Sequence, residues 1–168
     1  MGSPAEMPFD AQPIAADLHE QLLAPFVVGV ETALREVAQT EAAVRHDYRV
    51  QSRRCGGDLV AMLDLSSAST RGLALGVASA TAAALAQRVL SETLPNPDEA
   101  LIRDCLGEIA NVAAGQAKAL LHGTHHAFTF GTPRITSAAE LPSGGLEECL
   151  VTVLATDVGD VLVQLFLK

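Results

Sequence analysis

The sequence predicts a single α+β domain, in which a mostly antiparallel sheet is packed by two or three long helices. Three stretches carry apolar residues at helical spacing, and five or six shorter stretches rich in β-branched residues are separated by turn residues. The chain of 168 residues is 49% hydrophobic and 18% charged, which suits one domain with a real core. Aromatic residues make up only 4%, so Ala, Leu, Val and Ile must fill that core.

The first predicted helical stretch covers residues 14–39. Proline is tolerated in the first turn of a helix but not in its interior, and Pro25 falls inside this stretch. We therefore expect either a kink or a short helix followed by a longer one that starts near Pro25. Residues 1–13 contain three prolines and no periodicity, so they are expected to form a flexible leader to a domain of residues 14–168. The apolar spacing that predicts this helix is carried by Leu18, Leu22, Phe26, Val30, Leu34 and Val37.

The extended stretches are bounded by polar and turn residues. Residues 66–71 should connect a hairpin formed by 58–65 and 72–77, and residues 156–160 should connect a terminal hairpin formed by 149–155 and 161–167. A further turn is expected at Ser143-Gly144-Gly145. The other extended stretches are 43–52, 127–130 and 134–136.

Two further helices follow one another in the sequence, at residues 78–93 and 98–121. Pro95-Asn96-Pro97 should end the first of them. Asp98 and Glu99 are expected in the first turn of the second, where negative charge suits the helix dipole. Its predicted buried stripe consists of Leu101, Cys105, Ile109, Val112 and Leu120.

Another face of this last helix carries polar residues. Glu108 and Asn111 lie three positions apart, so their Cβ atoms should be about 5–6 Å apart and both side chains should point into solvent. Most such pairs are plain solvated surface. Gly107 and Gly115 flank the pair, although each glycine costs a helix roughly 1 kcal/mol relative to alanine. Close approach of another backbone would explain them, either the protein's own sheet or a docked partner. The full face comprises Asp104, Glu108, Asn111, Gly115 and Lys118.

The pattern D-x-x-G-E-I-A-N-x-x-x-G, from Asp104 to Gly115, resembles the signature helix of the CheC/CheX/FliY chemotaxis phosphatases. Residues 63–66 and 72–77 are similar to the paired strands before that helix, residues 132–135 to the short proline-containing strand after it, and Pro25-Phe26 to the family's first helix. The resemblance covers residue 17 to the C-terminus and implies a CheC-like fold. The chain carries one Glu-x-x-Asn, where CheC-like chains usually carry two, so it looks like CheX, whose relatives are homodimers.

The resemblance implies a phosphatase that hydrolyses the phosphoaspartate of a CheY-like response regulator receiver domain. In such a protein Asn111 would position the attacking water, and Glu108 would anchor the receiver's lysine. The chain would need no cofactor of its own, because Mg²⁺ is supplied by the response regulator. Asp104, Gly107, Gly115 and Lys118 would contact the partner, although plain solvation remains open for Asp104 and Lys118. The alternative is a non-catalytic, dimeric receiver-docking or scaffold module.

Composition and sequence patterns argue against several other classes of function. A formal net charge of −9 and few aromatic residues argue against binding to nucleic acid or to anionic membranes. The N-terminus lacks the pattern of a secretory signal, so we expect a cytoplasmic protein. Cys55, Cys105 and Cys149 are expected to be buried free thiols. His122, His125 and His126 lie close together, but one short turn rarely brings adjacent histidines onto one ion, so no metal site is predicted.

Overall fold

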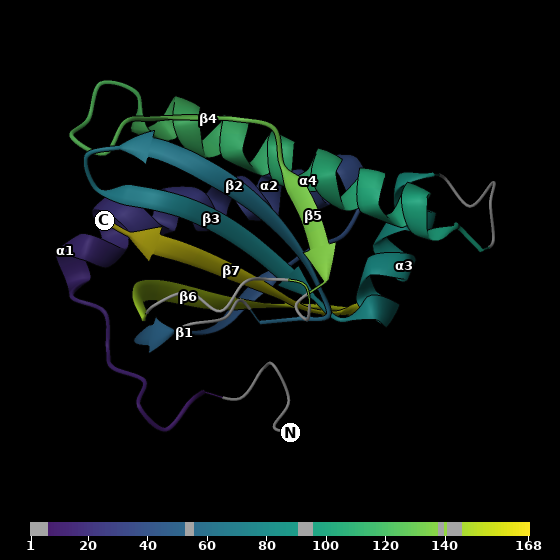
Figure 1. Cartoon of the computed structure of the whole chain (residues 1–168), viewed down its shortest axis with the longest axis horizontal. Helices are drawn as coiled ribbons and strands as arrows, with labels where there is room; N and C mark the ends of the chain where they lie inside the picture. Colours follow the sequence, from purple (N-terminus) through teal and green to yellow (C-terminus); the bar gives the residue numbers. More distant parts are fainter. Residues whose placement is uncertain (1–6, 53–55, 91–95, 138–139, 141–145) are drawn as a thin grey trace.

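The computed structural model describes residues 7–52, 56–90, 96–137, 140 and 146–168. Its seven strands form one antiparallel sheet in the order β1-β6-β7-β3-β2-β4, with β5 also paired to β2, and helices α2 and α4 lie behind this sheet in the view of Figure 1. The predicted α+β class is therefore confirmed, with one or two more strands than expected. The strands are β1 (Ala43–Ser52), β2 (Leu59–Ser67), β3 (Thr70–Val77), β4 (Phe128–Phe130), β5 (Arg134–Ser137), β6 (Glu147–Thr156) and β7 (Gly159–Leu167). The helices are α1 (Ala16–Leu18), η1 (His19–Leu23), α2 (Ala24–Ala38), α3 (Ser79–Val89) and α4 (Glu99–Leu121).

The first helical segment is divided at Pro25. It begins with α1 and the π-helical turn η1, and α2 then starts with Pro25 in its first turn. Proline has no N–H to donate, and its ring collides with the carbonyl one turn earlier. The wider π turn, whose bonds reach back five residues, precedes the proline at this point. The expected short helix followed by a longer one near Pro25 is confirmed.

Helices α2 and α4 approach each other closely at Gly29. A Cβ added at Gly29 would lie 2.5 Å from the carbonyl oxygen of Ala113 and 3.2 Å from the backbone nitrogen of Ala117. Only a residue without a side chain allows the two backbones to come so near. The sequence predicts such an approach at Gly107 and Gly115, whereas the structure places it at Gly29 on the facing helix.

The buried side of α4 differs in part from the predicted stripe. Cys105 and Ile109 are buried as expected, whereas Leu120 is 53% exposed. Small side chains fill the tight space against α2, so the buried stripe runs along alanines instead of through Leu120. A large apolar residue is a stronger sequence signal than alanine, and that is why the prediction at Leu120 was wrong. The buried members of α4 are Cys105, Leu106, Ile109, Ala110, Ala113, Ala114, Ala117 and Leu121.

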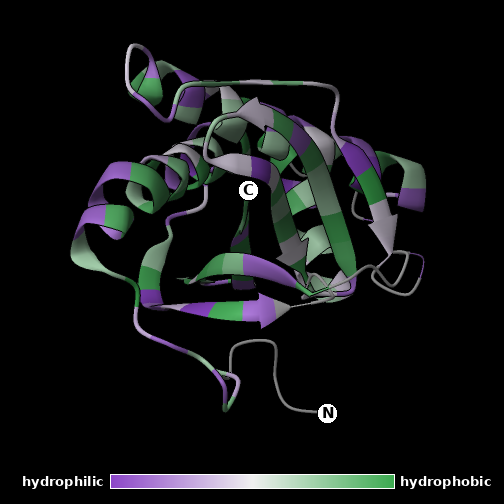
Figure 2. Ribbon diagram, turned by 60° about the vertical axis from the view of Figure 1, so that its left-hand side comes forward, coloured by the Kyte–Doolittle hydropathy of each residue, from purple (hydrophilic) through white to green (hydrophobic). Residues whose placement is uncertain are grey.

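The sheet is buried on both faces over its central strands. Leu63, Leu75 and Leu165 belong to the core shared with the helices, while Val60, Ala74 and Phe166 belong to a second cluster on the other face. Neighbouring residues of a strand point to opposite faces, so burial on both faces requires continuous apolar runs. In Figure 2 the long central strands are coloured mostly as hydrophobic, whereas polar and apolar colours alternate along the edge strand β1.

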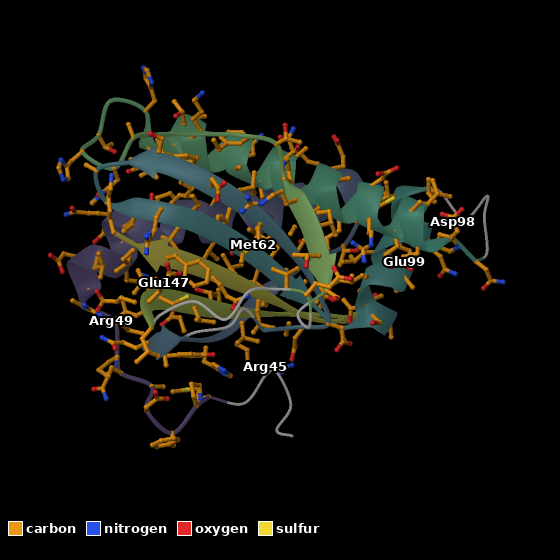
Figure 3. All side chains as sticks on the ribbon, viewed as in Figure 1. Arg45, Arg49, Met62, Asp98, Glu99 and Glu147 are labelled. Atoms are coloured by element: carbon orange, nitrogen blue, oxygen red, sulfur yellow. The ribbon has the colours of Figure 1, made fainter. Side chains whose placement is uncertain are left out.

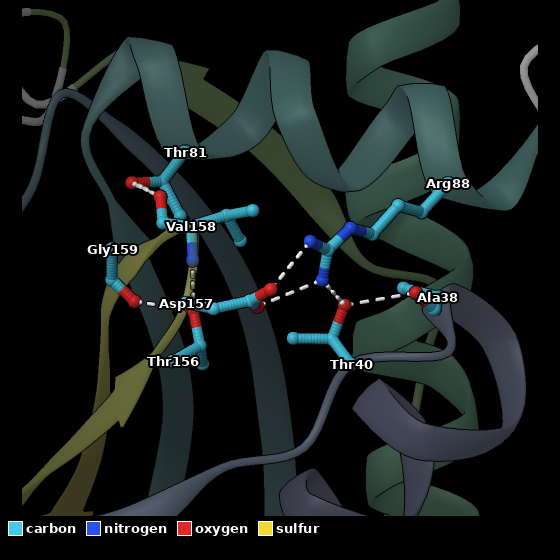
Figure 4. Close-up of polar contacts among 8 residues, drawn as sticks. All are labelled: Ala38, Thr40, Thr81, Arg88, Thr156, Asp157, Val158 and Gly159. Carbon is cyan, nitrogen blue, oxygen red and sulfur yellow. Dashed lines mark hydrogen bonds and ion pairs between the residues drawn. The ribbon is translucent and has the colours of Figure 1, made fainter.

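Helix α3 is fixed to its surroundings by a polar cluster around Arg88 (Figure 4). The Arg88 guanidinium donates to the two carboxylate oxygens of Asp157 at 2.8 and 2.7 Å and to the hydroxyl oxygen of Thr40 at 2.9 Å. Thr81 donates to the carbonyl oxygen of Val158 at 2.9 Å. The cluster thus joins α3 to the turn between β6 and β7 and to the segment after α2. The hydrogen bond from Arg88 holds the pKa of Asp157 below its usual value.

Some predicted boundaries change, and some fall outside the described residues. Asp98 lies just before α4 as its N-cap, not in its first turn, and its side chain accepts a hydrogen bond from the Leu101 N–H at 2.9 Å. Helix α3 ends at Val89. Predictions at Cys55, Pro95 and the turn Ser143-Gly144-Gly145 lie outside the described residues. None of the helices described is both long and apolar enough to cross a membrane.

Candidate active site

An open groove runs along α4 at the edge of the sheet formed by β4 and β5. It has a volume of about 570 Å³. Gly107, Glu108 and Asn111 lie on its helical side, with Asp104 and Arg103 toward the N-terminal end of α4. Residues of the segment from Phe130 to Ile135 form the opposite wall. The groove therefore combines one face of a helix with a segment that lies about twenty residues further along the chain.

The helical wall presents Glu108 and Asn111 to solvent because the intervening residues are buried. Ile109 and Ala110 pack into the core, and the two polar side chains three positions apart remain exposed on the same side. Within the part of the chain that the structure describes, neither side chain makes a hydrogen bond or an ion pair. Both are thus available to a partner, and the predicted exposure of this pair is confirmed.

The opposite wall leaves the sheet between two pairings with β2. Phe130 of β4 lies opposite Leu65, and Arg134 of β5 lies opposite Met62, so residues 131–133 span the gap between the two ladders. Pro133 suits such a position, because it has no N–H to donate to a ladder. The groove therefore forms only when the two short strands β4 and β5 both pair with β2.

Two arginines fix this wall in place. The Arg103 guanidinium donates to the carbonyl oxygen of Ile135 at 3.0 Å, and it is held by Glu99, whose position near the start of α4 is labelled in Figure 3. Arg134 pairs with Asp64 of β2 at 3.1 Å. Arg103 therefore connects the helical wall to β5, and Arg134 connects β5 to β2 from the outer side.

The structure brings four of the six predicted site residues together in the groove, namely Asp104, Gly107, Glu108 and Asn111. Gly115 and Lys118 lie on the same exposed face further along α4 and do not line it. The ammonium of Lys118 instead lies 5.9 Å from the centre of the Phe130 ring, which places it against the groove wall.

The two glycines of α4 are not explained by contact with this protein's own backbone. A Cβ at Gly107 would meet the Ile135 side chain at 3.6 Å, an ordinary van der Waals distance, and a Cβ at Gly115 would meet no atom of the described residues within 4 Å. Close helix–sheet packing, one of the two explanations offered from the sequence, is therefore wrong for both residues. The other explanation, approach of a docked partner, stays a prediction.

Sequence reasoning missed Arg103 and the aromatic ring of Phe130 as parts of the site. Arg103 follows Glu99 by four residues, a spacing that predicts an ion pair on the helix surface and gives no hint of a bond to a distant strand. Phe130 was expected in an extended segment, but its position in the groove depends on pairing with β2. Only tertiary structure brings these residues to the site.

The histidine cluster, Cys105 and Cys149 do not line the groove. The Nδ1 atom of His126 is 2.5 Å from the Ser69 hydroxyl oxygen, and the rings of His125 and His126 make an edge contact. Among the residues described, no group of three or more His, Cys, Asp and Glu side chains could hold a metal ion. Cys105 and Cys149 are buried thiols that form no disulfide among the described residues, as expected, and burial raises the pKa of the Cys105 thiol.

The fold is similar to solved structures of chemotaxis proteins. CheX from Desulfovibrio desulfuricans matches with a TM-score of 0.74 and 20% identity, over 86% of this chain and 97% of that one. CheX from Vibrio vulnificus matches with a TM-score of 0.71, 20% identity and the same coverages. CheX of Borrelia burgdorferi, solved in a complex with CheY, BeF3 and Mg²⁺, matches with a TM-score of 0.67 and 16% identity, over 87% of this chain and 97% of that one. At these identities the likeness establishes the fold.

The comparison with curated proteins found no relative of this chain. The family model described as "Chemotaxis phosphatase CheX" matches residues 59–153, which is more than half of the sequence. That range includes β2, whose pairing builds one wall of the groove, and the whole of α4, which forms the other. The chain therefore belongs to the CheX family of chemotaxis phosphatases.

Proposed function

We propose that this protein hydrolyses the phosphoaspartate of a CheY-like receiver domain, with Asn111 and Glu108 as its catalytic residues. The observation that carries the proposal is an exposed Glu108–Asn111 pair, free of internal partners among the described residues, on the wall of an open groove. A second support is the structural likeness to the CheX that was crystallised with CheY, BeF3 and Mg²⁺. Membership of the CheX family supplies the class of reaction.

In this mechanism Asn111 holds the attacking water in line with the bond that breaks. Its side-chain amide can accept one hydrogen bond from the water and donate another, which fixes both position and orientation. The water oxygen bonds to phosphorus, the bond between phosphorus and the aspartyl oxygen breaks, and inorganic phosphate and a free aspartate carboxylate result. Asparagine has no useful pKa and cannot act as a base, so its contribution is positional.

Glu108 would fix the helix over the receiver's active site. Its carboxylate can pair with the receiver's lysine, a charge-assisted contact that is stronger than one between neutral groups. In this proposal the receiver would bring its own Mg²⁺, which would supply positive charge to the phosphoryl oxygens there. Within this chain, Glu108 therefore contributes to docking as well as to catalysis.

The neighbouring residues of α4 would complete the docking surface. No described residue lies within 4 Å of the place that a Cβ of Gly115 would take, so a partner's backbone could approach the helix closely there, and Gly107 lines the groove beside Glu108. Asp104 and Lys118 offer one charge of each sign on the same face. We also propose that the protein acts in the cytoplasm as a homodimer, as the resemblance to CheX implies.

The proposal is tested by the decay of a phosphorylated CheY-like receiver with and without catalytic amounts of this protein. We expect accelerated decay with many turnovers for each molecule of the protein. Saturable binding to the BeF3-activated receiver without any acceleration would contradict the phosphatase and support a docking module instead. The receiver should come from the same organism, and its binding to this protein should be measured first, because a receiver that does not bind cannot test catalysis.

A further inference from the structure

A second pocket lies at the opposite edge of the sheet from the groove. It has a volume of about 340 Å³ and lies between α2 and the strands β1 and β6. The strand order places β1 and β6 at one end of the sheet and β4 at the other, and Figure 1 shows the same separation. The pocket shares no lining residue with the groove. It is therefore a separate feature that the proposed phosphatase does not use.

The walls of this pocket are aliphatic. Ala24, Val27 and Val28 of α2 form one side, and Val44 of β1 lies on another. Val28 is 48% exposed and Val44 is 49% exposed, so two of the most exposed aliphatic side chains of the described residues belong to one pocket. Apolar surface left in water at a concave site favours a ligand that covers it.

One residue of the pocket lining has a hydroxyl group without a hydrogen-bond partner among the described residues. Thr152 of β6 lines the pocket and is only 1% exposed, and its buried Oγ1 atom makes no hydrogen bond to any described residue. Its strand neighbours Val151 and Val153 belong to the cluster on the far face, so the Thr152 side chain points to the face that α2 covers. Buried polar groups are nearly always paired, and an orphan inside a pocket indicates a missing partner.

The polar rim is acidic. The Glu31 carboxyl of α2 lies beside the valines, where burial raises its pKa, with Arg35 acting in the opposite direction and Glu41 in the same one. No hydrogen bond or ion pair to this carboxyl is formed among the described residues. Asp47, the cross-strand neighbour of Thr152, is already paired with His19 at 2.8 Å. Glu31 is thus the rim carboxylate that forms no ion pair among the described residues, although the charge of Arg35, one turn further along α2, acts on it.

We propose that this pocket binds an alkylammonium group, with its aliphatic stem against Val28 and Val44 and its ammonium between Glu31 and Thr152. An ammonium has three N–H donors and no acceptor, so it can donate to the carboxylate and to the orphan hydroxyl oxygen together. An alkyl carboxylate would be repelled by Glu31 and by the net charge of −9, and an alcohol lacks the charge that Glu31 would balance. The group could come from a free amine or from a lysine side chain of a protein.

The test uses n-butylammonium, n-butanol and butyrate, three probes with nearly the same shape and different charge. Binding to the full chain would be followed by NMR through the methyl groups of Val28, Val44 and Thr152. We expect a dissociation constant on the order of 1 mM for butylammonium, a reasonable affinity for so small a ligand, and at least about tenfold weaker binding of the other two probes. Equal affinity for butylammonium and butanol would overturn the proposal.

Substitutions at Glu31 and Thr152 test the two polar contacts proposed for the ammonium. Glu31→Gln should weaken butylammonium binding about tenfold while the amide keeps the shape of the side chain. Thr152→Val should weaken it several-fold, and Thr152→Ser, which keeps the hydroxyl, should restore it. Glu36→Gln changes an exposed glutamate of the same helix outside the pocket and should have no effect. Unchanged binding in Glu31→Gln would overturn the assignment, and folding of each variant is read from the same spectra.

A last binding experiment distinguishes the two possible sources of the alkylammonium group, a free amine and a lysine side chain. Nα-acetyl-lysine amide carries the butylammonium stem on a peptide unit. Binding of this compound with an affinity close to that of butylammonium assigns the pocket to a lysine of a protein partner. Binding of butylammonium alone assigns it to a free small amine.

Discussion

At the scale of single residues, two glycines on facing helices have opposite roles. Gly29 is required by the packing of α2 on α4, because an added Cβ would collide with the Ala113 carbonyl oxygen at 2.5 Å. Gly115 is open on its solvent side. Glycine weakens a helix by roughly 1 kcal/mol relative to alanine, so the same substitution should have different signs at the two positions.

We predict that Gly29→Ala lowers the free energy of unfolding by about 1–3 kcal/mol, the range of an overpacked core, in spite of the better helix propensity of alanine. Gly115→Ala is the matched control and should raise it by up to about 1 kcal/mol. Urea unfolding followed by circular dichroism gives both values. Stabilisation by both substitutions would contradict the close approach at Gly29.

The carboxyl of Asp157 should contribute to the acid stability of the fold. Arg88 holds its folded-state pKa below the ordinary value of 3.8, so the stabilising contact is fully present above that pH and is lost as the pH falls through the folded-state pKa. We predict that unfolding free energy falls more steeply with decreasing pH below about pH 5 in the wild type than in Asp157→Asn. Urea unfolding at a series of pH values measures the two slopes, and identical slopes would show that the Arg88 contact does not form in solution.

At the scale of elements, the sequence predicts each helix and strand better than the contacts among them. The division of the first helix at Pro25 and the two hairpins follow from local rules on proline and on turn residues. The alanine stripe of α4 could not be predicted, because alanine fits either face of a helix. The groove wall could not be predicted either, since it requires β4 and β5 to pair with the same strand, β2.

The Arg103 side chain joins two elements of the groove. We predict that Arg103→Ala lowers stability by about 1–2 kcal/mol through the lost hydrogen bond to the Ile135 carbonyl and raises KM for the phosphorylated receiver several-fold, with a smaller change in kcat. Glu99→Ala removes only the ion-pair partner of Arg103, and its effect should be no more than about 1 kcal/mol, as for other exposed pairs. Steady-state dephosphorylation kinetics separate the two parameters. An unchanged KM in Arg103→Ala would mean that the wall does not contribute to docking.

At the scale of the whole molecule, the groove and the second pocket lie at opposite edges of the sheet. The groove at β4 and β5 carries the polar pair of α4, and the pocket at β1 and β6 carries Glu31 and Thr152. The resemblance in the sequence pointed to the first of these, because the Glu-x-x-Asn pattern is local to one helix. The second could not be predicted, since its lining residues come from four elements and carry no motif. Substitutions at one feature should leave the other unchanged.

The measurement that tests the central claim is single-turnover dephosphorylation of a receiver saturated with this protein, compared between wild type and Asn111→Ala. If Asn111 positions the water, the rate constant at saturation falls at least about a hundredfold, while the affinity for the BeF3-activated receiver changes less than about threefold. Asn111→Gln, which keeps the amide and moves it by one methylene, should recover little of the rate. A rate constant in Asn111→Ala equal to that of the wild type, at equal saturation, would contradict the mechanism.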